Sequence, residues 1–135
     1  MGAWGALAFD NDEANDWAFG LDGVNDLSLV EEAFRNVEAS VGGYLEQGTA
    51  AEALAACEVL ARLRGRDGYR NAYTDNVDKW VAAHRIAPSA ELIARGDAVI
   101  DRILGSDSEL RELWEEAGAE EWEAAVADLR ARLTS

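Results

Sequence analysis

Residues 1–21 read MGAWGALAFDNDEANDWAFGL, and this opening is the most informative stretch of the chain. It holds two Trp and two Phe, and five acidic or amide side chains precede Asp16. A cleavable secretory signal starts with positive charge and continues with an unbroken apolar stretch. In this chain the first basic residue is Arg35, and glycines and Asp10 interrupt the apolar residues. We therefore expect the opening to be part of the fold, as an arm packed on the rest.

Helix-capping patterns recur from this opening onward. Asp10 is predicted to cap a short first helix, because Glu13 follows three residues later and Phe9 and Ala14 occupy the two staple positions. The same spacing predicts helix starts at further sites, and Ser89 is predicted to cap a helix after Pro88. These further pairs are Ser28 with Glu31, Thr49 with Glu52, and Ser106 with Glu109, and another helix is predicted to begin at Thr74 or Asp75.

Apolar residues follow these starts at the three- and four-residue spacing of helices, while strand patterns are nearly absent. Glycines stop the segments at Gly42–Gly43, Gly65, Gly105 and Gly118, and the isolated Gly96 is predicted to mark a close helix crossing. We predict an all-α, single-domain bundle over residues 1–135, with about five to seven helices. The predicted inward-facing residues are Val30, Phe34, Val37, Val41, Leu54, Cys57, Leu60, Ala61, Leu63, Val77, Trp80, Val81, Leu92, Ile93, Val99, Ile100, Ile103, Leu104, Leu110, Leu113, Trp114, Trp122, Val126, Leu129 and Leu133.

The chain is strongly acidic, with 27 Asp and Glu against 12 Lys and Arg and a formal charge of −15. Such an excess repels phosphate backbones, so we expect no nucleic-acid partner. Its apolar runs are too short to cross a bilayer, and its single cysteine favours a cytoplasmic setting. The abundance of Arg and Ala indicates a GC-rich bacterial genome. Eight acids and no Lys or Arg occupy residues 1–34, namely Asp10, Asp12, Glu13, Asp16, Asp22, Asp26, Glu31 and Glu32.

The acids at residues 10–16 are a candidate metal site, because hard cations bind closely spaced carboxylates. The spacing lacks the central Gly of a calcium loop, and carboxylates in a first helical turn complement the helix dipole. The only histidine, His84, and Cys57 do not form a nucleophilic pair if Cys57 lies on an apolar helix face. We therefore predict no catalytic residue, no metal and no cofactor.

Trp4 precedes the first predicted helix and leaves two alternatives open. It either pins the arm across the bundle, which we favour because aromatic side chains are commonly buried, or it lies exposed beside the acids and anchors a partner.

Three motifs resemble one bacterial family, described as domain of unknown function 4259. They are M-G-A-W-G-x-x-x-F-D-N-D-x-A-x-D-W at 1–17, S-E-L-R-E-L-W at 108–114, and W-x-x-x-V-x-D-L-R-x-R-L at 122–133. The resemblance spans the whole chain and implies a small stand-alone bacterial protein, without supplying catalytic residues. The opening motif supplies the candidate interaction or structural residues Trp4, Phe9, Asp10, Asn11, Asp12, Asp16 and Trp17.

The preferred functional hypothesis is a non-enzymatic interaction module. Its acidic N-terminal surface, residues 10–32, would bind a cationic protein, as an inhibitor or immunity-type protein binds a basic toxin. The alternatives are a carboxylate-based binder of a small ligand or divalent metal, an enzyme with carboxylates in a cleft, and a structural homo-oligomer. The sequence leaves the oligomeric state open.

Overall fold

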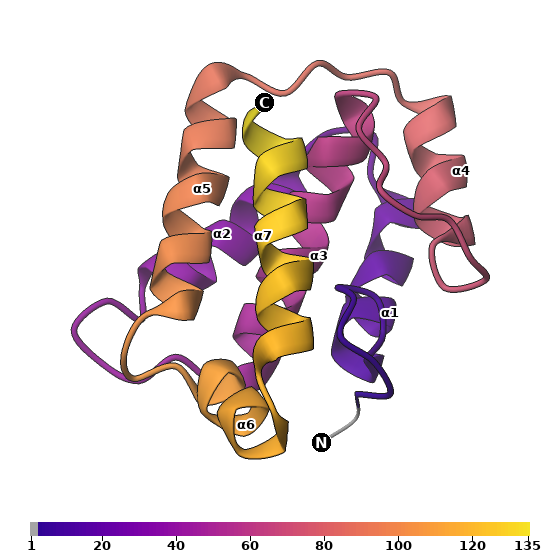
Figure 1. Ribbon diagram of the computed structural model, residues 1–135. Coiled ribbons are helices and arrows are strands. Elements are labelled where there is room, and N and C mark those ends of the chain that lie inside the picture. Colours follow the sequence, from indigo (N-terminus) through magenta and orange to yellow (C-terminus); the bar gives the residue numbers. More distant parts are fainter. Residues whose placement is uncertain (1–2) are drawn as a thin grey trace.

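The computed structural model describes residues 3–135, and these residues form seven α-helices and one 3-10 helix without any strand (Figure 1). The all-α, single-domain prediction is therefore confirmed. Met1 and Gly2 of the opening motif lie outside the described residues. In chain order the elements are α1 (Asp12–Phe19), η1 (Gly20–Gly23), α2 (Ser28–Glu38), α3 (Gln47–Leu63), α4 (Asp75–Ala83), α5 (Ala90–Leu104), α6 (Glu109–Ala117) and α7 (Glu120–Thr134).

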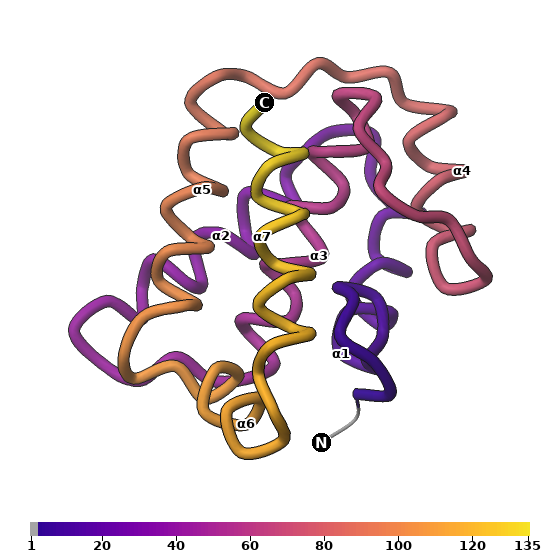
Figure 2. The backbone as a smooth tube through the Cα atoms, in the orientation of Figure 1, coloured from indigo at the N-terminus to yellow at the C-terminus, as the bar shows by residue number. Residues whose placement is uncertain are grey.

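Helix α3 lies at the centre and contacts each of the other six α-helices. Helices α5 and α7 lie on one side of it, α1 and α4 lie on the other, and α6 sits at one end (Figures 1 and 2). Every residue from Ala53 to Arg62 is buried, so this helix is covered all round. Because α3 is rich in alanine, its neighbours can approach closely on several sides.

Helix α5 packs closely against the core at Gly96. A Cβ atom at this position would lie 3.1 Å from Leu133 of α7, 3.2 Å from Phe34 of α2 and 3.5 Å from Cys57 of α3. The predicted close crossing at Gly96 is thus confirmed, and it joins four helices at one point.

Several predicted helix starts are wrong by one to three residues, for identifiable reasons. Helix α1 is capped by Asn11, whose Oδ1 accepts the Ala14 N–H at 2.8 Å, and Asp10 is used elsewhere. Helix α3 begins at Gln47 rather than Thr49, since Gln47 donates its N–H to Glu109 of α6 at 2.8 Å. That cap comes from 62 residues away, so no local pattern could reveal it.

Among three further predicted helix starts, that of α5 is confirmed, and those of α6 and α2 differ from the prediction. The cap of α5 is Ser89 as predicted, with its Oγ accepting the Leu92 N–H. The N-cap of α6 is Ser108 rather than Ser106, and its Oγ donates to the Ile103 carbonyl instead. Ser28 does not cap α2, because it donates both its N–H and its hydroxyl to Asp26.

Helix ends follow the glycine signals, with one exception. Helix α3 ends at Leu63 and is followed by Gly65 with φ +77°, while Arg66 donates its N–H to the Ala61 carbonyl. This is the expected glycine-assisted stop. Helix α2 instead ends at Glu38, before Gly42–Gly43, so the predicted inward position of Val41 is wrong and its side chain is 71% exposed.

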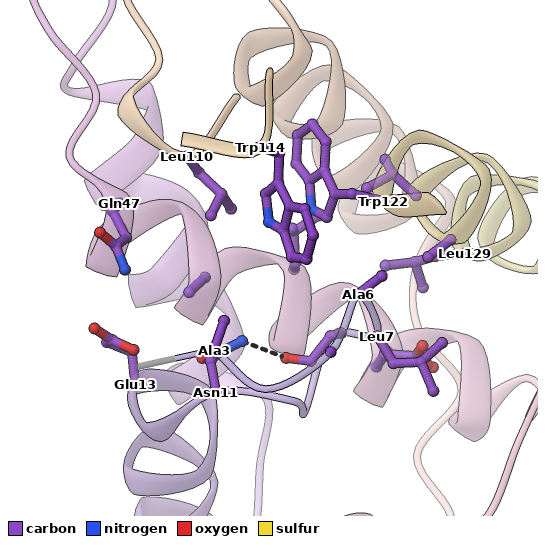
Figure 3. Close-up of a pocket in the computed structure, with 17 residues that line it drawn as sticks. Ala3, Ala6, Leu7, Asn11, Glu13, Gln47, Leu110, Trp114, Trp122 and Leu129 are labelled. Atoms are coloured by element: carbon purple, nitrogen blue, oxygen red, sulfur yellow. Dashed lines mark hydrogen bonds between the residues drawn. The ribbon is translucent and has the colours of Figure 1, made fainter. Parts of the chain in front are cut away.

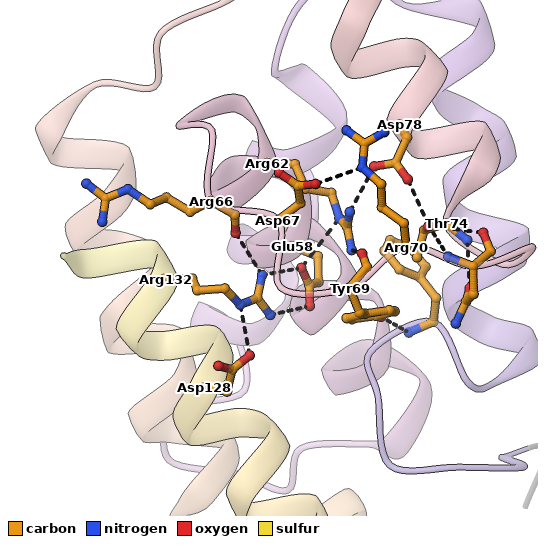
Figure 4. A network of polar contacts seen from close by, with 12 residues as sticks. Glu58, Arg62, Arg66, Asp67, Tyr69, Arg70, Thr74, Asp78, Asp128 and Arg132 are labelled. Atoms are coloured by element: carbon orange, nitrogen blue, oxygen red, sulfur yellow. Dashed lines mark hydrogen bonds and ion pairs between the residues drawn. The ribbon is translucent and has the colours of Figure 1, made fainter.

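A buried ionic network joins α3, α4 and α7 (Figure 4). Glu58 of α3 receives two hydrogen bonds from Arg132 of α7, at 2.9 and 2.8 Å, and lies 3.5 Å from the Nε of Arg62. Arg62 also donates to Asp78 of α4 and to the Tyr69 carbonyl, each at 2.8 Å. Because charges this deep must be paired, the network fixes the relative positions of the three helices.

Candidate functional site

The N-terminal arm, residues 3–11, is a compact loop organised by Asp10. Its Oδ2 accepts the Leu7 N–H at 3.1 Å, and its carbonyl accepts the Trp4 N–H at 2.9 Å. A Cβ on Gly5 would collide with the Asp10 carboxylate, so the loop requires glycine there. Asn11 ties the loop to α1 by donating to the Ala8 carbonyl while it caps the helix. Asp10 and Asn11 are therefore structural residues.

Phe9, and not Trp4, pins the arm to the bundle. The Phe9 side chain is fully buried, its carbonyl accepts a hydrogen bond from Asn15 at 2.7 Å, and its N–H donates to the Tyr69 hydroxyl. Trp4 is 49% exposed and rests on the equally exposed Tyr73, with ring centroids 5.0 Å apart. The favoured reading of Trp4 as the pin is thus wrong, and its ring lies at the surface.

The remaining motif residues lie on α1 in two settings. Asp12 and Asp16 are exposed, one turn apart on the outer side of the helix. Trp17 is partly buried and packs against the hydrophobic core. Among the predicted site residues, the surface-exposed side chains are therefore Trp4, Asp12 and Asp16.

Six exposed acids of residues 12–32 lie on α1, in η1, in the loop after η1 and at the start of α2, and we call this set the acidic face. Ten ion pairs occur within residues 3–135, and all of them use acids from Glu38 onward. None of the acids at 10–32 pairs with a described basic residue. The members of the acidic face are Asp12, Asp16, Asp22, Asp26, Glu31 and Glu32.

A cleft lies beneath the arm, between it and helices α3, α6 and α7 (Figure 3). The arm contributes Leu7 and the small residues Ala3, Gly5, Ala6 and Ala8, and the facing walls carry Trp114 of α6 and Trp122 of α7. These two rings are nearly parallel, with an interplanar angle of 5° and centroids 6.3 Å apart. The other apolar lining residues are Ala51, Leu54, Leu110, Ala125, Val126 and Leu129.

One end of this cleft is polar. Glu13 and Gln47 lie there beside Asn11, while Leu7 and Leu129 lie toward the opposite end (Figure 3). The Oε2 atom of Glu13 is buried and accepts no hydrogen bond from residues 3–135. Nearby on α3, burial and repulsion from Glu32 and Glu13 raise the pKa of Glu52. This end of the cleft therefore concentrates negative charge that the described residues leave uncompensated.

Sequence reasoning missed the cleft, although one signal was present. Trp114 and Trp122 flank Gly118 in the predicted helical hairpin, so their rings could have been expected to meet. Gln47 of α3 and the arm also line the cleft, but this depends on tertiary contacts that cannot be predicted from the spacing of residues in the sequence.

Other candidate chemistry is accounted for by packing. Cys57 is fully buried, burial raises the pKa of its thiol, and its Sγ lies 3.8 Å from the Gly96 carbonyl. His84 stacks on Trp80 and lies 3.0 Å from Asn25 through Nε2. Within residues 3–135, no three His, Cys, Asp or Glu side chains are grouped to hold a metal ion. The same part of the chain has no helix that is both long and apolar enough to span a membrane.

Comparison with known proteins identifies the family. The model of the family described as Domain of unknown function (DUF4259) matches residues 2–125, so the chain belongs to this family. No curated protein and no solved structure matches the chain significantly.

Proposed function

We propose that this protein is a non-enzymatic interaction module that binds a cationic protein through its acidic face, in the manner of an inhibitor or immunity protein. The observation that supports the proposal is a difference in ion pairing between the acids of two parts of the chain. Acids after position 37 form ten ion pairs, whereas those of residues 10–32 form none with a described basic residue.

Electrostatics gives such a face a specific role in association. Exposed charges of one sign attract an oppositely charged partner from a distance and accelerate encounter, and salt screens the attraction over about 8 Å at physiological ionic strength. The half-exposed Trp4 and Tyr73 add an aromatic surface of the kind that anchors interfaces. The proposal includes a cytoplasmic, bacterial setting, in keeping with one buried cysteine and no disulfide.

The test is a pull-down with three baits at low and at high salt. One bait is the natural chain, and a second carries Asp12→Asn, Asp16→Asn and Asp22→Asn. Asp26 is left unchanged because it accepts two hydrogen bonds from Ser28. The control bait carries Glu91→Gln, Glu116→Gln and Glu121→Gln, which remove the same charge from exposed positions on α5, α6 and α7.

We expect a basic protein to be captured at low salt by the natural and control baits, and to be lost at high salt and from the acidic-face variant. Equal loss from both variants would show that net charge alone is responsible. That outcome would overturn the proposal, and so would capture that is the same with the natural chain and with both variant baits.

A further inference from the structure

We infer that the cleft beneath the N-terminal arm accepts one lysine side chain of the partner, with its ammonium group on Glu13 and its alkyl chain along the tryptophans. This inference rests on the proposed function and identifies a specific contact within it. It also involves residues outside the acidic face, so the two can be tested separately.

The shape of the cleft selects a slender occupant. The cleft encloses only about 30 Å³. It is thus a narrow slot with room for very few water molecules. Such a slot is too small for a nucleotide or a sugar and selects a slender occupant.

The walls of the slot match an alkyl chain. Trp114, Trp122 and Leu54 line the slot together with Ala6 and Leu7 of the arm. Glu13 and Gln47 lie at one end (Figure 3). Lysine commonly buries its methylene groups against apolar surface while its charged head stays in a polar environment. Removing these methylene groups from water is favourable, and the indole faces also attract a nearby cation.

Glu13 supplies the position for the ammonium group. Its buried Oε2 accepts no hydrogen bond from the described residues, and leaving such an acceptor unsatisfied is costly. An ammonium group carries three donors and a full positive charge, so it would satisfy this oxygen. Glu58 also lines the cleft, but Arg132 and Arg62 already hold its carboxylate. Glu13 is therefore the available acid.

Glu52 supports the same assignment. Its pKa is raised by burial and by repulsion from Glu32 of α2 and Glu13 of α1, so negative charge from two other helices acts on Glu52. A bound cation would relieve this repulsion at the polar end of the cleft.

The experiment titrates the full chain with n-butylamine and records two-dimensional NMR spectra of the indole N–H groups. The comparison compounds are n-butanol, which lacks the charge, and the blocked amino acids N-acetyl-lysine amide and N-acetyl-arginine amide. We expect saturable shifts of the Trp114 and Trp122 signals in the millimolar range for the amine and the lysine derivative. Dissociation constants should be at least tenfold weaker for the alcohol and the arginine derivative.

Two variants and one control locate the site. Glu13→Gln should weaken amine binding at least tenfold, and Ala125→Met should abolish it by filling the slot from α7. Glu91→Gln removes the same charge from an exposed position on α5, outside the cleft and the acidic face, and should leave binding within twofold. Thermal unfolding of each variant verifies that it folds, and Ala125→Met tests the slot even if Glu13→Gln is unstable.

Failure of the inference is distinguishable from failure of the proposed function. No indole shift, equal binding of the arginine derivative, or equal weakening by Glu91→Gln overturns the lysine assignment. A partner that loses binding with the acidic-face variant but tolerates Glu13→Gln and Ala125→Met also overturns it, while the proposed function stands. Amine binding without any basic partner would instead retain the cleft as an amine site and reject the interaction module.

Discussion

Replacement of Glu58 by Gln should be among the most destabilising conservative changes in this chain. The Glu58 side chain is 2% exposed and accepts both hydrogen bonds from Arg132, while Arg62 beside it is equally buried. Glutamine keeps the shape but removes the charge, so the guanidinium groups of Arg62 and Arg132 would retain only Asp78 and Asp128 as carboxylate partners. Because Asp128 is 63% exposed, it compensates little.

The expected loss follows from the burial of both partners. Breaking a buried ion pair on one side costs about 3–5 kcal/mol. Total unfolding free energies of domains are about 5–15 kcal/mol, so this single change would remove a large share of stability. With an m-value of about 1.5 kcal/mol per molar urea, a loss of 3 kcal/mol lowers the unfolding midpoint by about 2 M.

Urea titration followed by tryptophan fluorescence measures this loss, and Asp128→Asn is the matched control. The control removes a carboxylate from the same Arg132 at an exposed position, and we expect it to cost less than about 1 kcal/mol. Equal midpoints for Glu58→Gln and Asp128→Asn would refute the reasoning. The double variant Glu58→Leu with Arg132→Leu should lose less than the sum of its single variants, because it removes both charges together.

Three further predictions concern the cap, the crossing and the acidic cluster. Asn11→Ala should cost about 1 kcal/mol in urea titration, whereas Thr49→Ala, inside α3, should cost less than about 0.5 kcal/mol, and the reverse order would contradict the structure. Gly96→Val should lose about 2 kcal/mol by overpacking, seen as a thermal midpoint lowered by about 6 °C, and an unchanged midpoint would mean that the crossing is loose. The raised pKa of Glu52 means that the folded state binds its proton more tightly than the unfolded state, so Glu52→Gln should be more stable than the natural chain near neutral pH. That advantage should vanish as pH falls through the raised pKa and the ordinary Glu range, and a pH-independent difference would exclude the mechanism.

The fold was predictable from sequence wherever local chemistry decides the outcome. Ser89 caps α5, Gly65 follows the end of α3, and Gly96 marks a crossing, because each effect depends on a few neighbouring residues. The start of α3 was not predictable, since Glu109 of another helix accepts the Gln47 N–H. Val41 was misplaced because a helical pattern continued past the actual end of α2 at Glu38.

The candidate site was predictable only in part, for a related reason. The excess of acids in residues 10–32 is visible in the sequence, and the structure leaves six of them exposed. Whether a motif residue serves the loop or the surface depends on three-dimensional contacts. Asp10 and Asp12 look alike in sequence, yet Asp10 organises the arm and Asp12 faces solvent. The cleft depends on contacts among four separate segments.

Because α3 lies at the centre of the bundle, the walls of the cleft differ in how readily they open locally. Amide hydrogens of α3 are covered by six helices and should exchange with deuterium only on global unfolding. Helix α6 has one buried residue, Leu110, and the arm is anchored through Phe9, so both should exchange through smaller fluctuations. The slot can therefore widen on the side of α6 and the arm while α3 and α7 keep its floor in place. Binding there would appear as slowed exchange in the arm and α6, with α3 unchanged.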